Sequence, residues 1–346
     1  MRTTIITQSL DVPFISLILK YDYYIEGTID HKIEYIGNIH RIIKISKDQL
    51  LLCTDFCVSL YDLKTVKIIS SLHDVLHVEL LPENRIVTSY IDGLLQIWSL
   101  NDLITPIHEF QSFVSYTLKI FMLPKNKIAL YGLDNNIPIW DLKHTIIELK
   151  GHTGAVKCMA IYKNKLLSGS EDTTLKIWNL DTNMCESTLT GHEQTVNNIL
   201  VSQDNLIISS SIYGNIRIWD SEVCQRVIDC DMPINRIIIT KNKIITCYKS
   251  TYSKYNEIHV WNLYEDSKDI LTGHTKYIIN IHLLPNGDLM SSSSDKSIRI
   301  WDLEENKCIN TWNNDHTPNL FVVCLNKIIT DYANGSKNEI NNLYVY

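Results

Sequence analysis

Short runs of apolar and β-branched residues alternate with polar turn residues along most of the chain. Residues 151–180 contain three such runs, VKCMAIY, KLLSGS and TLKIWNL, separated by turn-forming pairs such as Lys-Asn and Glu-Asp. Runs of this length between turn residues are typical of β-strands joined by hairpins. A fourth run, CESTLT, follows. The pattern shows no helical periodicity, so it predicts units of four short antiparallel strands in an all-β fold.

The third run of this unit recurs at intervals of about forty residues. It contains a tryptophan or a tyrosine each time, at Tyr61, Trp98, Trp140, Trp178, Trp219, Trp261, Trp301 and Tyr346. A four-stranded unit repeated at this interval is the signature of a β-propeller blade. Closing such blades into a ring removes the exposed edges of their sheets.

Gly-His pairs at 151–152, 191–192 and 273–274 come before three of the tryptophan-containing runs. With these pairs, residues 31–346 resemble the WD-repeat β-propeller family. The resemblance implies that a histidine, a serine, an aspartate and a tryptophan form a structural hydrogen-bonded tetrad in each complete blade. The implied members are His152, Ser168, Asp172 and Trp178 in one blade, His274, Ser291, Asp295 and Trp301 in a second, and His192, Ser209 and Trp219 in a third.

Several blades depart from this pattern. The blade of His192 has Tyr213 at the position of the aspartate. The blade of Trp98 keeps Thr88 and Asp92, whereas its histidine, His73, is displaced by one residue, and the blade of Trp140 has Asp134 but no matching histidine. We expect blades with incomplete tetrads to be locally softer.

Histidine, serine and aspartate are also the residue types of a hydrolytic triad. Here the set recurs together with a tryptophan whose N–H needs a partner when buried, which favours a structural network. The sequence lacks the GxSxG, GxxxxGK[ST], HExxH, GxGxxG and EF-hand motifs. We therefore expect a protein that is not an enzyme and has no metal or cofactor.

Eight units can be counted, and the last one stops at its third strand. The segment HKIEYIGN, residues 31–38, comes directly before the first unit. We predict an eight-bladed ring closed by pairing of residues 32–36 with the final unit; a seven-bladed ring with one degenerate end unit is the alternative. Residues 1–30 are expected to form an N-terminal extension, as a short helix, an irregular segment or an extended strand.

The composition is that of an ordinary soluble globular protein, with 346 residues, 45% hydrophobic and 21% charged. A net charge of -7 disfavours nucleic acid as the partner. The nine cysteines form no CxxC pair, which favours thiols in a reducing compartment. No signal peptide or membrane span is predicted, so we expect a cytoplasmic protein, with the nucleus as the alternative.

Recognition by a propeller depends on its loops. We therefore expect a non-catalytic scaffold that binds protein or peptide partners, whose identity and the oligomeric state stay open. Exposed tyrosines are common interface anchors, so the candidate partner-binding residues are Tyr213, Lys249, Tyr252, Lys254 and Tyr255. A solvated insertion without a partner is the other interpretation of 249–255. The alternative function is a ubiquitin-ligase substrate receptor that binds a degron at the top surface, which would need an arginine cluster if the degron is phosphorylated.

Overall fold

The computed structural model describes residues 16–18, 24–26, 31–35, 39–46, 49–54, 57–62, 65, 67–111, 119–142, 146–230, 232–248, 256–284, 286–313, 317–324, 327–333 and 341–345. Strands account for the regular structure of these residues, apart from one 3-10 turn, η1 (Pro124–Asn126). The prediction of an all-β fold is therefore confirmed. The chain divides into two compact units, one made of Met1–His73, Asn235–Ile238 and Asn242–Tyr346, the other of Asp74–Ile234 and Ile239–Lys241.

Four antiparallel sheets of four strands make up the second unit, and in each sheet the strands pair in chain order. We call each sheet a blade and number it by its place in the chain. Blade 2 contains β8 (Val75–Leu81), β9 (Arg85–Tyr90), β10 (Leu94–Ser99) and β11 (His108–Gln111). Blade 3 contains β12 (Lys119–Leu123), β13 (Lys127–Tyr131), β14 (Ile137–Trp140) and β15 (Ile146–Leu149). Blade 4 contains β16 (Val156–Tyr162), β17 (Lys165–Ser170), β18 (Leu175–Asn179) and β19 (Met184–Leu189), and blade 5 contains β20 (Val196–Val201), β21 (Leu206–Ser211), β22 (Asn215–Asp220) and β23 (Val223–Asp229).

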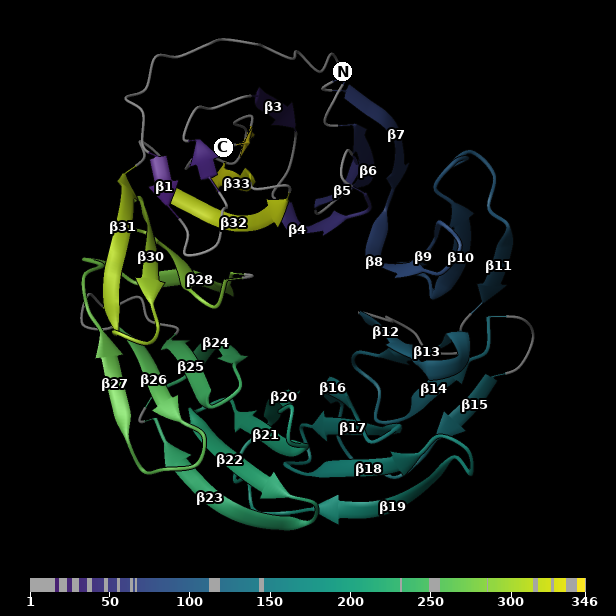
Figure 1. Ribbon diagram of the computed structural model, residues 1–346. Helices are drawn as coiled ribbons and strands as arrows, with labels where there is room; N and C mark the ends of the chain where they lie inside the picture. Colours follow the sequence, from purple (N-terminus) through teal and green to yellow (C-terminus); the bar gives the residue numbers. More distant parts are fainter. Residues whose placement is uncertain are drawn as a thin grey trace. The chain divides into compact units, whose positions relative to one another are not determined.

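Neighbouring blades of this unit contact each other through their first strands, β8 with β12 and β16 with β20 (Figure 1). The fourth strand of each of these blades lies at the opposite edge of its sheet from the first strand.

The other blades belong to the first unit, except that Ile234 and Ile239, the two end residues of the first strand of blade 6, fall in the second. Blade 1 contains β4 (Ile39–Lys44), β5 (Gln49–Thr54), β6 (Cys57–Asp62) and β7 (Lys67–His73). Blade 6 contains β24 (Ile234–Ile239), β25 (Lys243–Tyr248), β26 (Ile258–Asn262) and β27 (Lys268–Leu271). Blade 7 contains β28 (Ile278–Leu283), β29 (Leu289–Ser293), β30 (Ser297–Asp302) and β31 (Lys307–Asn313).

Blade 8 is assembled from both ends of the chain. It contains β3 (His31–Tyr35), β34 (Asn341–Val345), β33 (Lys327–Ala333) and β32 (Thr317–Cys324), in that order. β3 pairs with β34 in a register that sets Lys32 opposite Tyr344 and Glu34 opposite Asn342. The predicted pairing of the segment after residue 31 with the final unit is thereby confirmed. The described residues thus contain eight four-stranded sheets, one for each repeat unit in the sequence; their closure into a ring stays a prediction.

The N-terminal extension is extended where it is described, one of the three forms that the sequence allows. Where it is described, it contains β1 (Ser16–Ile18) and β2 (Tyr24–Glu26), which pair antiparallel with Ser16 opposite Glu26. Hydrogen bonds between two short extended segments satisfy backbone groups that a helical turn would otherwise satisfy.

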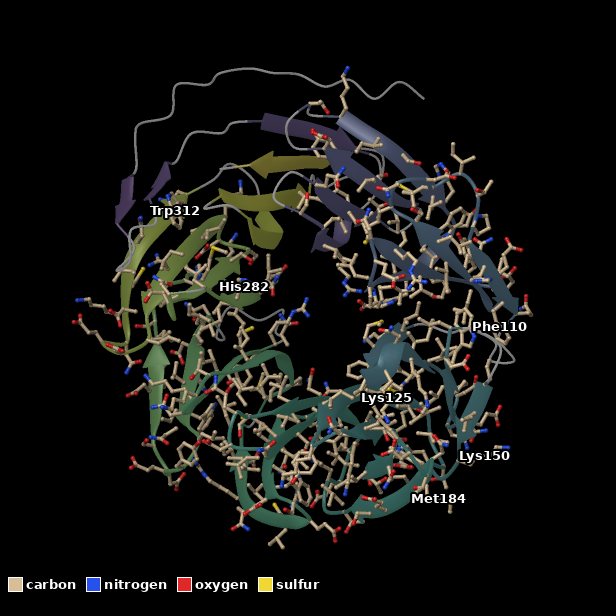
Figure 2. The ribbon with its side chains drawn as sticks, turned by 45° about the vertical axis from the view of Figure 1, so that its right-hand side comes forward. Phe110, Lys125, Lys150, Met184, His282 and Trp312 are labelled. Atoms are coloured by element: carbon tan, nitrogen blue, oxygen red, sulfur yellow. The ribbon has the colours of Figure 1, made fainter. Side chains whose placement is uncertain are left out.

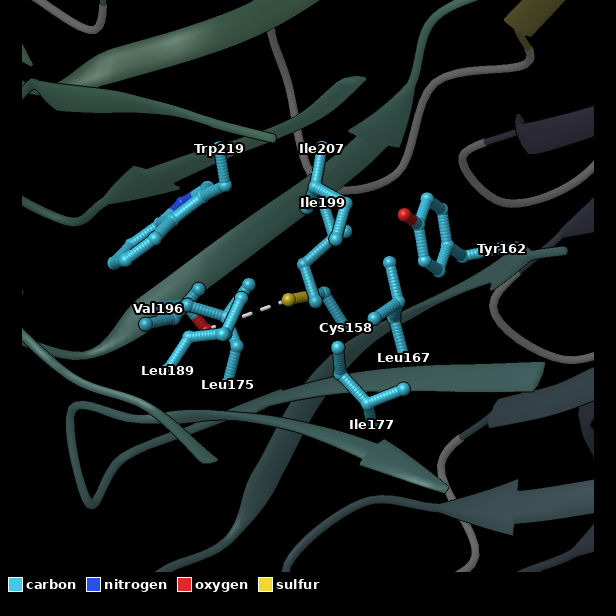
Figure 3. Packing of buried hydrophobic residues seen from close by; sticks show 10 residues of the cluster. All are labelled: Cys158, Tyr162, Leu167, Leu175, Ile177, Leu189, Val196, Ile199, Ile207 and Trp219. Atoms are coloured by element: carbon cyan, nitrogen blue, oxygen red, sulfur yellow. Dashed lines mark hydrogen bonds between the residues drawn. The ribbon is translucent and has the colours of Figure 1, made fainter. Parts of the chain in front are cut away.

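Apolar side chains between blades 4 and 5 form one of the cores (Figure 3). Leu167 and Leu175 of blade 4 and Val196 of blade 5 all belong to this cluster. Gly169 permits the close approach, because a Cβ atom there would lie 2.7 Å from both Cys158 Sγ and Val196 Cγ1. Burial raises the pKa of the Cys158 thiol to about 12, so this thiol packs as a neutral side chain. All eight cysteines that the structure describes with their side chains are free thiols.

Truncating a side chain of this core should destabilise the protein strongly. Leu167→Ala leaves a cavity between two blades, and we expect the free energy of unfolding to fall by about 2–5 kcal/mol. Met184→Ala is the matched control, because Met184 is exposed on the outer strand β19 (Figure 2) and should change stability by less than about 0.5 kcal/mol. Urea denaturation measures both variants, and equal losses would contradict this account of the core.

Candidate functional site

The tetrad of blade 4 connects a loop, two strands and a turn. His152 lies in the Gly-His loop before β16, Ser168 on β17, Trp178 on β18, and Asp172 in the turn between those two strands. The Trp178 indole N–H donates to Ser168 Oγ at 2.7 Å, and Ser168 Oγ lies 2.7 Å from His152 Nε2. His152 Nδ1 lies 2.7 Å from Asp172 Oδ2. The four side chains therefore form one continuous hydrogen-bonded chain.

The carboxylate of Asp172 anchors this chain. It accepts the backbone N–H of Thr153 at 2.9 Å and that of Thr174 at 3.0 Å. Burial alone would raise the pKa of Asp172, but the hydrogen bonds outweigh burial and lower it to about 2. Burial also lowers the pKa of His152 against the opposing effect of Asp172. A neutral His152 thus donates from Nδ1 to Asp172 and accepts the Ser168 hydroxyl at Nε2.

Blade 7 repeats this arrangement. Trp301 donates to Ser291 Oγ at 2.7 Å, and His274 lies 2.8 Å from Ser291 Oγ and 2.9 Å from Asp295 Oδ2. The Thr275 backbone N–H donates to Asp295 Oδ2 at 2.9 Å. The hydrogen bonds again outweigh burial and hold the pKa of Asp295 well below its usual range. The residues that the resemblance implies thus meet in two blades.

The order of contacts in blade 4 is that of a Ser-His-Asp triad, but the serine is not available to a substrate. Ser168 is 0% exposed, and its oxygen already accepts the indole N–H of Trp178. Ser291 is buried in the same way in blade 7. The geometry holds the Gly-His loop against the turn between the second and third strands.

Blade 5 contains the tetrad without its aspartate. Trp219 donates to Ser209 Oγ at 2.9 Å, and His192 Nε2 lies 2.7 Å from the same oxygen. Tyr213, at the aspartate position, is 63% exposed. Although His192 is only 5% exposed, its Nδ1 has no hydrogen-bond partner among the described residues. Burial, and secondarily the charge of Arg217, lower the pKa of His192 to about 4.

Two blades without a suitable histidine use a tyrosine that sequence reasoning missed. In blade 6 Trp261 donates to Thr246 Oγ1 at 3.1 Å, the Thr246 hydroxyl donates to the Tyr248 hydroxyl at 3.1 Å, and that hydroxyl lies 2.7 Å from His259 Nδ1. The insertion at 249–255 moves Thr246 out of the usual spacing from the tryptophan. The signal that could have found it is Thr-x-Tyr at the end of the second strand.

The same Thr-x-Tyr pattern ends the second strand of blade 2. Trp98 donates to Thr88 Oγ1 at 2.9 Å, and the Tyr90 hydroxyl interacts with both residues. His73 lies exposed at the end of β7. Blade 3 has Leu130 at the serine position, and the Trp140 N–H is buried without a hydrogen-bond partner in the described part of the chain.

The turns and the Gly-His loops lie at one end of the blades, which we call the Gly-His end. In the second unit, the turn after β13 reaches the Gly-His loop of blade 4, since Asn135 Nδ2 donates to His152 O at 3.0 Å. The turns after β17 and β21 bind the Gly-His loops of their own blades, through Glu171 N–H to Ala155 O at 2.9 Å and Ile212 N–H to Thr195 O at 3.1 Å.

Exposed apolar side chains recur at one position of these turns. The residue just before the aspartate position is Ile91 in blade 2, Leu133 in blade 3 and Ile212 in blade 5, with exposures of 62%, 56% and 42%. Blades 4 and 7 have Glu171 and Ser294 there. Sequence reasoning missed these residues, although each lies seven positions before a repeat tryptophan. Of the predicted partner-binding residues, Tyr213 lies beside Ile212, whereas Lys249, Tyr252, Lys254 and Tyr255 lie outside the described residues.

The described residues contain neither a metal-binding group nor a membrane-spanning helix. No three His, Cys, Asp or Glu side chains gather there as a metal-binding group would require. No helix in that part of the chain is long and apolar enough to cross a membrane.

The family WD40, described as WD domain, G-beta repeat, matches residues 143–179, 183–220 and 266–302. These segments contain the tetrad residues of blades 4, 5 and 7. These three segments are therefore WD repeats, as the sequence resemblance predicted. The crystal structure of the computationally designed Ika8 protein is similar in fold, with a TM-score of 0.71 at 19% identity over 90% of this chain and 98% of that chain.

Relatives are similar in sequence to parts of this chain. The E3 ubiquitin-protein ligase COP1 of Arabidopsis thaliana is 26% identical over 53% of this chain and 27% of its own length. The nuclear distribution protein PAC1 of Arthroderma otae is 28% identical over 47% of this chain and 40% of its own length. The chain thus spans less than half the length of these two relatives.

Restoring the aspartate of blade 5 should stabilise the protein. Tyr213→Asp gives the buried His192 N–H a charged acceptor, and we expect the free energy of unfolding to rise by about 1–3 kcal/mol. Tyr213→Ser removes the ring without supplying a carboxylate and should stay within about 0.5 kcal/mol of the wild type. Urea denaturation at pH 7 compares the three proteins. An aspartate variant no more stable than the serine variant would show that the carboxylate does not reach His192.

Stability should fall as the pH is lowered from 6.5 towards 4. The unfolded His192 takes up a proton near its ordinary pKa of 6.5, whereas the folded one does so only near 4. The unfolded state therefore binds more protons in this window, and stability is lost as the pH falls. Urea midpoints measured against pH should show a smaller loss for His192→Gln than for the wild type. His108→Gln, which removes an exposed imidazole on β11, should keep the wild-type slope.

Proposed function

We propose that the protein is a non-catalytic interaction scaffold that binds a protein or peptide segment at the Gly-His end of its blades. The observation that carries this proposal is the recurrence of Ile91, Leu133 and Ile212 at the same exposed turn position. The turn itself does not require an apolar residue, because Glu171 and Ser294 form the same turn in blades 4 and 7. Exposed apolar side chains that gather on one surface are typical of interaction sites.

The chemistry of this end suits a protein segment with apolar side chains. Tyr213, beside Ile212, supplies an exposed aromatic ring of the kind enriched in interface hot spots. Between Leu133 and Ile212 along the chain lies a charged pair, Lys157 and Glu171, at 2.7 Å. A partner would therefore place polar groups over blade 4 and apolar groups over blades 3 and 5. The net charge of -7 favours protein over nucleic acid as this partner.

The proposed absence of catalysis is supported by the burial of the only triad-like serines of the described blades. Ser168 and Ser291 are 0% exposed and engaged by tryptophans. A nucleophile must reach its substrate, and these two hydroxyls have no access to solvent.

A substrate receptor of a ubiquitin ligase is the second candidate, favoured by the similarity to the E3 ubiquitin-protein ligase COP1. Recognition of a phosphorylated degron would need several arginines directed at one point. Arg217 and Arg299 instead lie over the rings of Trp219 and Trp301, at 5.9 and 6.0 Å from the ring centres. Their position favours the general scaffold over a phosphodegron receptor.

Replacing the three exposed aliphatic residues tests the scaffold. The triple variant carries Ile91→Ser, Leu133→Ser and Ile212→Ser. We expect it to capture at least tenfold less of each partner from cell extract than the tagged wild type does, as measured by quantitative mass spectrometry. The matched control is Ile104→Ser, Met184→Ser, Val223→Ser, which removes exposed apolar residues next to the turns between third and fourth strands, at the opposite end of the blades.

The two triple variants separate the outcomes. Equal loss of partners in both would mean nonspecific adhesion, and equal retention would exclude the Gly-His end as the contact. Ligase adaptors captured by the wild type would favour the second candidate. Thermal denaturation of both variants checks that the fold is intact.

A further inference from the structure

The turn after the second strand has the same backbone in blades 4, 5 and 7. Gly214 of blade 5 has a φ of +89° and donates its N–H to Ser211 O at 3.2 Å. Thr173 and Lys296 hold the corresponding positions, with φ values of 69° and 70° and N–H···O distances of 3.2 and 3.1 Å. The replacement of aspartate by Tyr213 has therefore left the path of this turn unchanged.

In blades 4 and 7 this turn and the Gly-His loop surround the carboxylate with donors. The shared donors are the histidine Nδ1–H, the backbone N–H of the next residue, and the backbone N–H and hydroxyl of the residue two after the aspartate. The residues are His152, Thr153 and Thr174 in blade 4 and His274, Thr275 and Ser297 in blade 7. The equivalent residues of blade 5 are His192, Glu193 and Asn215. Blade 5 keeps the histidine and the two backbone N–H groups and has the Asn215 amide in place of the hydroxyl, but its own chain supplies no aspartate to accept from them.

Two buried polar atoms of blade 5 mark this place. His192 Nδ1 and Asn215 Oδ1 are both buried, and neither has a hydrogen-bond partner within the described residues. The oxygen and nitrogen of an asparagine amide are assigned from their hydrogen-bond partners, so Asn215 can equally turn its NH2 group to an acceptor. Buried polar groups without partners cost stability, which is the reason a ligand that satisfies them would gain affinity. Tyr213 is largely exposed and forms no hydrogen bond with either atom.

The charges nearby favour an anion. Arg217 lies beneath the Gly-His loop of blade 5, since a Cβ atom at Gly191 would be 2.8 Å from Arg217 NH1. Its Nε is buried without a hydrogen-bond partner among the described residues. Glu193 is the opposing charge, but its side chain is exposed, where solvent and salt screen its repulsion.

We propose that blade 5 binds the side-chain carboxylate of an aspartate or glutamate from a partner protein, in the place that Asp172 and Asp295 fill in blades 4 and 7. The inference rests on the proposed scaffold function, for which it names a contact of the partner. The carboxylate accepts the N–H groups of His192, Glu193 and Asn215. The neighbouring Ile212 and Tyr213 pack against the apolar part of the same segment.

Blocked tripeptides test the site on the full chain. The probes are Ac-Gly-Asp-Gly-NH2 and Ac-Gly-Glu-Gly-NH2, with Ac-Gly-Asn-Gly-NH2 as the neutral control. Side-chain nitrogen resonances of 15N-labelled histidines report binding, and His192→Gln assigns the resonance. We expect a saturable shift of the His192 Nδ1 resonance with one or both acidic peptides and binding at least tenfold weaker with the asparagine peptide. Asp and Glu peptides compared at equal concentration identify the preferred side chain.

Tyr213→Asp distinguishes a binding site from a structural defect. This variant should lose peptide binding while becoming more stable than the wild type, because its own carboxylate occupies the donors. Tyr213→Ser should keep the binding. An unshifted His192 resonance, an equal response to the asparagine peptide, or full binding in Tyr213→Asp would each overturn the proposal. The proposal would also be overturned if Glu193→Gln shifts the His192 resonance and the peptides bind to that variant but not to the wild type. The Glu193 side chain itself would then occupy the site in the wild type.

Failure of this site is distinguishable from failure of the scaffold. If the peptides do not bind but the Ile91, Leu133 and Ile212 triple variant still loses its captured partner, the scaffold stands and the carboxylate site is rejected. If the wild type captures no partner that depends on the Gly-His end while the acidic peptides bind, the carboxylate site stands and the scaffold loses its support.

Discussion

The N–H of a buried tryptophan is stabilised by an acceptor, and in five described blades the surrounding hydrogen-bond network depends on how that acceptor is supplied. The tryptophan side chains at 140, 178, 219 and 301 are among the largest fully buried groups of the protein. In all five blades where the structure describes both groups, a serine or threonine hydroxyl on the neighbouring strand accepts the N–H. The distance is 2.7–2.9 Å in blades 2, 4, 5 and 7 and 3.1 Å in blade 6. That hydroxyl then needs a partner of its own, and this second need extends the network to the surface.

The blades meet the second need in different ways. In blades 4 and 7 a histidine from the Gly-His loop accepts the hydroxyl proton, and an aspartate fixes the histidine. In blade 6 Tyr248 takes this part, because no Gly-His loop supplies a histidine. The first solution fastens a loop to a turn across the surface, whereas the second stays within neighbouring strands. Loops at the Gly-His end are thus held in some blades and left independent of the tetrad in others.

The sequence predicted those features that depend on fixed spacing. Tetrad residues ten and six positions before the tryptophan could be identified in blades 4 and 7, and the unpaired third strand of the last unit predicted its pairing with residues near Lys32. Sequence reasoning missed Thr246 because an insertion changes its sequence spacing from Trp261. The strand register, with Thr246 opposite His259, is kept. Exposure of Ile91 and Leu133 could not be predicted either, since an aliphatic residue beside a strand end is buried or exposed according to the course of the turn.

Blade 5 shows how a structural network can become a recognition site. An aspartate at position 213 would satisfy His192 and add stability, as Asp172 and Asp295 do in their blades. Blade 5 lacks that stabilising interaction. It keeps the turn, the histidine and the nearby arginine that would favour a carboxylate there. Sites kept short of their most stable form are a recurrent feature of functional surfaces, because the missing interaction is left for a ligand to make. The burial of His192 then makes the site selective, since only a hydrogen-bond acceptor that reaches the buried Nδ1 atom can satisfy it.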